Sequence, residues 1–212
     1  MFKPLAVSGE QPYQMLDDAG ESVVMRPDLT LPLARLLSTT SIVPPVQWWY
    51  VGDIFRVKKS LSGTYNQITQ AGIELIGYRS LKAEWACLSE AGKICRTLGL
   101  THLTLELSDA QFVPQILRTL QLNDAAADAF QTAFFAKELS TYQDLIAPLA
   151  TNPLYPFLQQ WPWLFGDSET IFAELKRLLP SNVITDRLAP LQQTVAFLKD
   201  QFPELRVTID LT

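Results

Sequence analysis

The sequence predicts an α+β fold in which a small antiparallel sheet is flanked by helices. Residues 48–78 form two extended stretches, rich in aromatic and β-branched side chains, joined by a polar loop. Most of the remaining chain carries apolar residues at helical spacing, interrupted by proline and glycine. With 212 residues, of which 48% are hydrophobic, the chain can bury a large core.

The predicted elements begin with a helix over residues 29–38, after Pro27. The hairpin follows, with strands at 48–57 and 67–78 and turn chemistry at 60–64. Further helices are expected at 82–98, 109–122, 124–135, 137–149, 153–163, 168–179 and 186–202, and further strands at 103–107 and 205–211. The aromatic residues of 155–165 have few cations between them, so we expect them to pack between helices rather than to stack on bases.

Side chains alternate between the two faces of a strand, so parity predicts which residues of the hairpin point the same way. One face of the first strand carries Tyr50, Gly52, Ile54 and Arg56, and one face of the second carries Ile68, Gln70, Gly72, Glu74 and Ile76. Each of these faces therefore combines a glycine with polar side chains. The two glycines among them predict a shallow floor where a small polar ligand approaches the backbone. An ordinary solvated sheet face is the alternative, and the pattern alone weighs both about equally.

Two blocks of residues carry a resemblance to a known family. The hairpin contains Phe55-Arg56 at the end of its first strand, then Gln70 and Glu74 before Ile76-Gly77. Upstream lies Met25-Arg26-Pro27-Asp28-Leu29-Thr30. In this order the blocks resemble motif 2 and the Arg-Pro-Glu-x-Thr signature of class II aminoacyl-tRNA synthetases, in their histidyl-tRNA synthetase branch. The resemblance implies a class II synthetase-like antiparallel sheet with flanking helices and a helical insertion.

The chain departs from this family where a synthetase holds its nucleotide. Lys58 stands where the family has a glutamate that binds the adenine amino group. Thr69 stands where the family has a histidine. Thr64 and Asn66 replace loop arginines, so Arg56 alone remains of the set that neutralises phosphate. We expect the activation chemistry to be lost, and with it any catalytic residue, metal or cofactor.

The positions that contact the amino acid in the family are kept. The resemblance implies a histidine-binding site at Asp28, Thr30, Arg56, Gln70 and Glu74. Two carboxylates and an amide suit a ligand that carries an ammonium group and imidazole N–H donors. Loss of the nucleotide half with retention of the histidine half resembles the ATP phosphoribosyltransferase regulatory subunits, which are paralogues of the synthetase.

That resemblance implies a non-catalytic protein that partners the short catalytic subunit in a hetero-oligomer for the first step of histidine biosynthesis, with histidine as effector. A histidyl-tRNA synthetase, or a fragment of one, is the alternative, and a stand-alone amino-acid-binding module is a third. The net charge of −5 and scattered cations weaken the case for tRNA binding without excluding it.

The resemblance also implies a domain division, with a partial sheet core at residues 1–108 and 203–212 and a mainly helical insertion at 109–202. The resemblance implies that the chain is truncated at both ends relative to the family, without motif 1 or motif 3. Cys87 and Cys95 lie on one predicted helix, too far apart to bridge, and buried reduced thiols are expected. The single histidine, His102, is expected to be exposed or capping. With no leader-like segment or long apolar run, a cytoplasmic location is expected.

Overall fold

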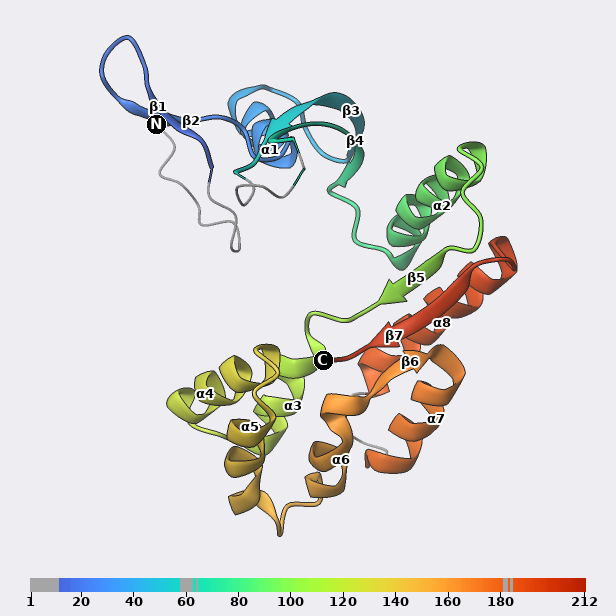
Figure 1. Cartoon of the computed structure of the whole chain (residues 1–212). Helices are drawn as coiled ribbons and strands as arrows, with labels where there is room; N and C mark the ends of the chain where they lie inside the picture. The colour runs from blue at the N-terminus through green and yellow to red at the C-terminus, as the bar shows by residue number, and fades with distance from the viewer. Residues whose placement is uncertain (1–11, 58–62, 64, 181–182, 184) are drawn as a thin grey trace. The chain divides into compact units, whose positions relative to one another are not determined.

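The computed structural model describes residues 12–57, 63, 65–180, 183 and 185–212, which Figure 1 traces in colour. The chain divides into two units, Met1–Ala83 and Glu84–Thr212. Helix α2 (Leu81–Thr97) begins at the end of the first unit and lies mostly in the second.

The first unit contains two antiparallel hairpins with a helix between them in the chain. Strand β1 (Gln14–Leu16) pairs with β2 (Ser22–Val24). Asp17 closes their turn, because its carboxylate accepts hydrogen bonds from the backbone N–H groups of Ala19 and Glu21 at 2.9 and 2.8 Å. Helix α1 (Thr30–Thr39) follows, at the position that the sequence predicted.

The second hairpin, which the sequence also predicted, pairs β3 (Val46–Phe55) with β4 (Gln67–Ile76). The two strands pair over their whole lengths, from Val46 opposite Ile76 to Phe55 opposite Gln67. Apart from Gly63, the predicted turn residues lie outside the described part of the chain. Among the described residues of this unit Ile54 alone is a buried hydrophobic residue, at 2% exposure. Hydrogen bonds therefore hold this unit more than a core does.

The second unit is mainly helical around a small sheet. In chain order after α2 it contains β5 (Thr104–Leu107), α3 (Phe112–Leu120), α4 (Asp124–Phe135), α5 (Leu139–Ile146), η1 (Ala147–Leu149), α6 (Tyr155–Gln160), η2 (Trp161–Trp163), β6 (Phe165–Asp167), α7 (Ser168–Leu178), α8 (Thr185–Gln201) and β7 (Arg206–Asp210). Side chains cap two of these helices: Asn123 accepts a hydrogen bond from Ala126 N at the start of α4, and Asp167 accepts from Glu169 N and Thr170 N at the start of α7.

The sheet of this unit has the order β5-β7-β6, with β5 parallel and β6 antiparallel to β7. Val207 and Ile209 of the central strand β7 are 3% and 0% exposed. Helices α3 to α8 lie in the chain between β5 and β7, as a parallel connection requires (green to red in Figure 1). The predicted strands at 103–107 and 205–211 are confirmed.

Aromatic side chains form the centre of the second unit, as expected for Phe157 and Trp161, but Trp163 and Phe165 of the same segment are 61% and 55% exposed, so the expected packing is wrong for these two. Trp161 is fully buried, and its ring lies 4.5 Å from that of Phe134 and 5.0 Å from that of Phe157. Its indole Nε1–H donates to the carbonyl of Leu211 at 2.8 Å. Tyr142 donates to the carbonyl of Leu158 at 2.6 Å, and burial raises the pKa of its phenol. Both donors have an acceptor, so neither is left buried and unpaired.

The structure also departs from some expectations. Strands β1, β2 and β6 were not predicted, because three residues are too few for an alternating pattern. Cys87 and Cys95 are half-buried rather than buried. His102 is exposed, as expected, and has a left-handed backbone with φ of 58°. None of the described helices combines the length and apolar character needed to cross a membrane.

The buried indole gives a direct test of this core. Trp161→Phe removes the donor to the Leu211 carbonyl and leaves a cavity, so we expect a loss of about 2–4 kcal/mol in the free energy of unfolding. Urea unfolding followed by circular dichroism measures it. Trp163 is 61% exposed, and Trp163→Phe is the matched control, with an expected change within about 0.5 kcal/mol. Equal effects of the two substitutions would contradict the assignment of the core.

Candidate functional site

The register of β3 and β4 brings the two predicted polar faces together on one side of the hairpin. Residues directly opposite each other in a ladder point the same way. Gly52 lies opposite Gln70, Tyr50 opposite Gly72, and Trp48 opposite Glu74. The polar residues predicted on separate strands therefore share a single face.

The segment between β2 and α1 is fastened to the end of β3. The backbone N–H of Phe55 donates to the carbonyl of Arg26 at 2.9 Å. The guanidinium groups add two bonds, one from Arg26 Nε to the carbonyl of Asp53 and one from Arg56 Nε to the carbonyl of Pro27 at 2.8 Å. Because arginine donors point in fixed directions, these bonds set the path of the segment as well as its position.

This segment presents Asp28 and Thr30 to the hairpin. Asp28 Oδ1 accepts from the backbone N–H of Leu31 at 2.7 Å, in the first turn of α1. Thr30 Oγ1 donates to Glu74 Oε1 at 2.7 Å and so links the start of α1 to β4. One oxygen of each carboxylate is thus held by the protein, which orients both groups.

Gln70 carries an unusual feature for a half-buried side chain. Its Oε1 atom is buried and has no hydrogen-bond partner in the described part of the chain. A buried acceptor without a donor costs about 1–3 kcal/mol. A ligand that supplies an N–H group at this position would remove that cost.

The two glycines of the face accommodate side chains of the protein itself. A Cβ built on Gly72 would lie 2.4 Å from the ring of Tyr50, so the tyrosine occupies the space above this glycine. A Cβ on Gly52 would lie 3.5 Å from Leu29 Cδ1 and 3.8 Å from a terminal nitrogen of Arg26. The floor proposed from the sequence is therefore covered by Tyr50 and Leu29, and the polar groups at its margins remain for a ligand.

The opposite face of the hairpin holds a separate polar cluster. Asp53 accepts hydrogen bonds from Thr69 Oγ1 at 2.7 Å and from Gln67 Nε2 at 2.8 Å. These two bonds, and then the charge of Arg26, lower the pKa of Asp53 below its ordinary value. Thr69 therefore fixes the register of the ladder, and its side chain points away from Gln70 and Glu74.

The structure thus places all five predicted site residues on or beside the same face. Asp28 and Thr30 come from the start of α1, and Gln70, Glu74 and Arg56 from the hairpin and its end. Lys58 and Thr64, which mark the departures from the family, lie outside the described residues. Sequence reasoning listed Tyr50 on this face but gave it no role, and it did not include Arg26. Tyr50 could have been noted because strand parity places it on the same face as Gly52. The position of Arg26 depends on a tertiary contact, so the sequence gives no signal for it.

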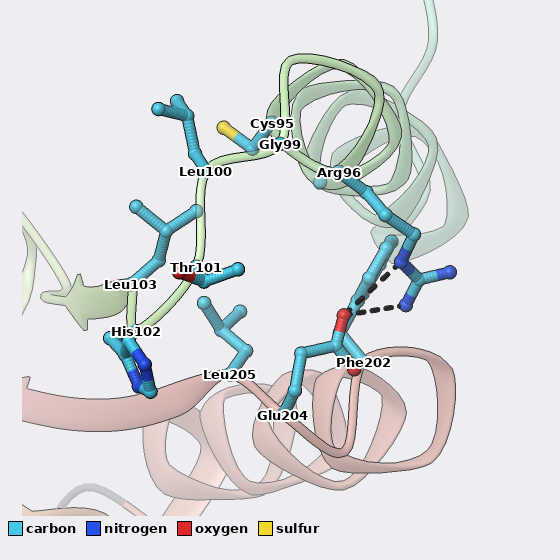
Figure 2. Close-up of a pocket in the computed structure, with 11 residues that line it drawn as sticks. Cys95, Arg96, Gly99, Leu100, Thr101, His102, Leu103, Phe202, Glu204 and Leu205 are labelled. Carbon is cyan, nitrogen blue, oxygen red and sulfur yellow. Dashed lines mark hydrogen bonds and ion pairs between the residues drawn. The ribbon is translucent and has the colours of Figure 1, made fainter.

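The second unit contains a separate cavity of about 410 Å³. Figure 2 shows it between the end of α2, the loop that follows, and the turn before β7. Arg96 and Glu204 form an ion pair of 2.7 Å at its rim, and the Arg96 guanidinium lies 4.9 Å from the ring centre of Phe202. The rest of the lining is mainly apolar, so this cavity offers no charge that the protein has not already paired. None of the predicted site residues lines it.

Comparison with known proteins agrees with the motifs. A family model described as histidyl-tRNA synthetase matches residues 5–212. The chain is 99% identical over 212 residues to an ATP phosphoribosyltransferase regulatory subunit of Lacticaseibacillus casei, covering all of this chain and 56% of that protein. It is 42% identical over 212 residues to the protein of the same name in Lactiplantibacillus plantarum, covering all of this chain and 55% of that protein. The chain therefore spans about half the length of the curated relatives it matches.

Solved structures show the same fold. One is described as an ATP phosphoribosyltransferase regulatory subunit/histidyl-tRNA synthetase from Bacillus halodurans C; it has a TM-score of 0.79 at 22% identity, covering 95% of this chain and 53% of that chain. An ATP phosphoribosyl transferase (HisG:HisZ) complex from Thermotoga maritima gives a TM-score of 0.70 at 16% identity, covering 99% of this chain and 75% of that chain. These likenesses confirm the predicted class II synthetase-like α+β fold. The family model matches residues 5–212, which is almost the whole of this chain. The chain therefore belongs to the histidyl-tRNA synthetase family.

Proposed function

We propose that this chain is part of a non-catalytic regulatory subunit of ATP phosphoribosyltransferase. The subunit would act with the catalytic subunit in the first step of histidine biosynthesis and take part in its feedback control by histidine. The observation that carries the proposal is the identity of 99% and 42% to two proteins named as such regulatory subunits. The geometry of the β3–β4 face supports it, because the groups suited to an amino acid lie together there.

The effector site is assigned to Asp28, Thr30, Arg56, Gln70 and Glu74. Glu74 and Asp28 attract the ammonium and imidazole N–H groups of histidine, and the unpaired Oε1 of Gln70 accepts one more N–H. Charge-assisted hydrogen bonds of this kind contribute about 1.5–3 kcal/mol each. Arg56 supports the site through its bond to the Pro27 carbonyl.

We infer that this chain has lost the part of a synthetase site that binds the nucleotide. Lys58 is a donor where an adenine-reading acceptor stands in the family, and Thr69 is engaged with Asp53 on the other face. A histidyl-tRNA synthetase, or a fragment of one, remains the alternative, because the matching family model carries that description. Because the residues that would hold the nucleotide are replaced, we propose no catalytic residue and no synthetase activity for this chain.

The partner that we propose is the catalytic phosphoribosyltransferase subunit. Support comes from the Thermotoga maritima structure, which is described as a complex of two kinds of subunit and shares this fold. We propose that such a hetero-oligomer of biosynthetic subunits works in the cytoplasm.

Feedback inhibition tests the effector site. Glu74→Gln and Asp28→Asn each remove a charge that faces the ligand, so we expect the histidine concentration for half-inhibition of the reconstituted complex to rise about 10- to 100-fold. Asparagine can still accept the bond from Leu31 N, so helix α1 should keep its start. Activity without histidine should stay unchanged. Glu21→Gln, an exposed carboxylate of the same unit, is the control and should leave inhibition unchanged. Unchanged inhibition in both site variants would remove this assignment.

Amino-acid activation separates the proposal from its alternative. We expect no pyrophosphate exchange that depends on ATP and histidine, because the chain lacks the residues that hold the nucleotide. A working histidyl-tRNA synthetase assayed in parallel is the control for the assay. Exchange that requires both substrates would favour the synthetase instead.

A further inference from the structure

We propose that Arg26 binds the carboxylate of the amino-acid effector and so makes the site specific for a ligand with a free carboxylate. This inference rests on the proposed effector site and adds a residue that contacts the carboxylate of the ligand. Three observations carry it: where the Arg26 guanidinium lies, how it is held, and which charges surround the place of the ligand.

The guanidinium of Arg26 lies over the β3–β4 face. One of its terminal nitrogens is 3.8 Å from the position of a Cβ on Gly52, the residue directly opposite Gln70. The absent side chain of Gly52 leaves this space to Leu29 and to the arginine. Arg26 is exposed, so a ligand in solution can reach these nitrogens.

Arg26 is also oriented in advance. Its Nε–H donates to the carbonyl of Asp53, and its own carbonyl accepts from Phe55 N at 2.9 Å. With Nε and the backbone engaged, the two terminal NH₂ groups are the donors that remain for a ligand. This arrangement suits bidentate contact with a planar carboxylate, and little side-chain entropy remains to be lost on binding.

The charges around the ligand require such a cation. Asp28 and Glu74 attract the ammonium group of a zwitterionic amino acid but repel its carboxylate, so a cation beside the carboxylate offsets that repulsion. Arg56, the other nearby arginine, is likewise held at Nε, by the carbonyl of Pro27, whereas Arg26 has a terminal nitrogen placed near Gly52. The carboxylate of Asp53, whose pKa the charge of Arg26 helps to lower, accepts hydrogen bonds from Thr69 and Gln67 on the opposite face.

The test compares two ligands on matched variants of the complete protein in complex with the catalytic subunit. Histidine and histidinamide share the ammonium and imidazole groups, and only histidine has the carboxylate. Isothermal titration calorimetry gives both dissociation constants, at a pH where both ammonium groups are protonated. The variants are Arg26→Gln, and Arg79→Gln as a control that removes an exposed arginine of the same unit.

We expect the wild-type protein and Arg79→Gln to prefer histidine over histidinamide by about tenfold or more. Arg26→Gln should weaken histidine binding by about 10- to 100-fold and change histidinamide binding by less than about threefold, so that the preference disappears. Circular dichroism melting of each variant confirms that the protein is folded. Arg26→Lys should keep part of the preference, because it restores the charge without the planar fork.

Three results would overturn the proposal. Equal weakening of both ligands by Arg26→Gln would mean that Arg26 only holds its segment on β3. A full preference for histidine in that variant would place the carboxylate elsewhere. Binding of neither ligand to the wild-type complex would refute the effector site itself, and this inference with it; the first two results would leave that site standing.

Discussion

The bonds that fasten residues 26–30 to the end of β3 are the constraint on which the candidate site depends. Phe55 N to Arg26 O and Arg56 Nε to Pro27 O fix a connecting segment that would otherwise be free to adopt many conformations. Ordering each backbone residue costs about 1–2 kcal/mol, and this cost is met on folding rather than on ligand binding. Helix α1 begins at Thr30, so its first turn and the Thr30–Glu74 bond follow from the same attachment.

The two units are stabilised in different ways, and the site lies in the less buried one. The second unit surrounds Trp161 with aromatic rings and satisfies its indole N–H through Leu211. In the first unit, among the residues that the structure describes, Ile54 is the one buried hydrophobic residue, and Trp49 of β3 is 79% exposed. A two-stranded ribbon is at best marginally stable by itself, so cross-strand pairs and the attached segment carry much of its order. Binding elements are commonly drawn from such less stable parts of a fold.

Periodicity predicted much of this arrangement because β3, β4 and most of the helices are long enough to show it. Parity placed Gln70 and Glu74 on one face, since the period of a strand is two. The register that sets Gly52 opposite Gln70 also depends on Asp53, Thr69 and Gln67 on the other face, which parity alone does not determine. The ring of Tyr50 over Gly72 follows from parity once the register is known, whereas the guanidinium of Arg26 at Gly52 arises from tertiary packing that no local pattern marks. The division into a sheet core and a helical insertion at 109–202 stays a prediction.

We propose that an amino-acid site of synthetase origin serves regulation in place of catalysis in this protein. The activity of the catalytic subunit tests this proposal, measured by formation of phosphoribosyl-ATP with and without the complete protein and across a histidine titration. We expect activity to depend on the added protein and to fall as histidine rises. A catalytic subunit that is equally active, and equally inhibited by histidine, without this protein would contradict it.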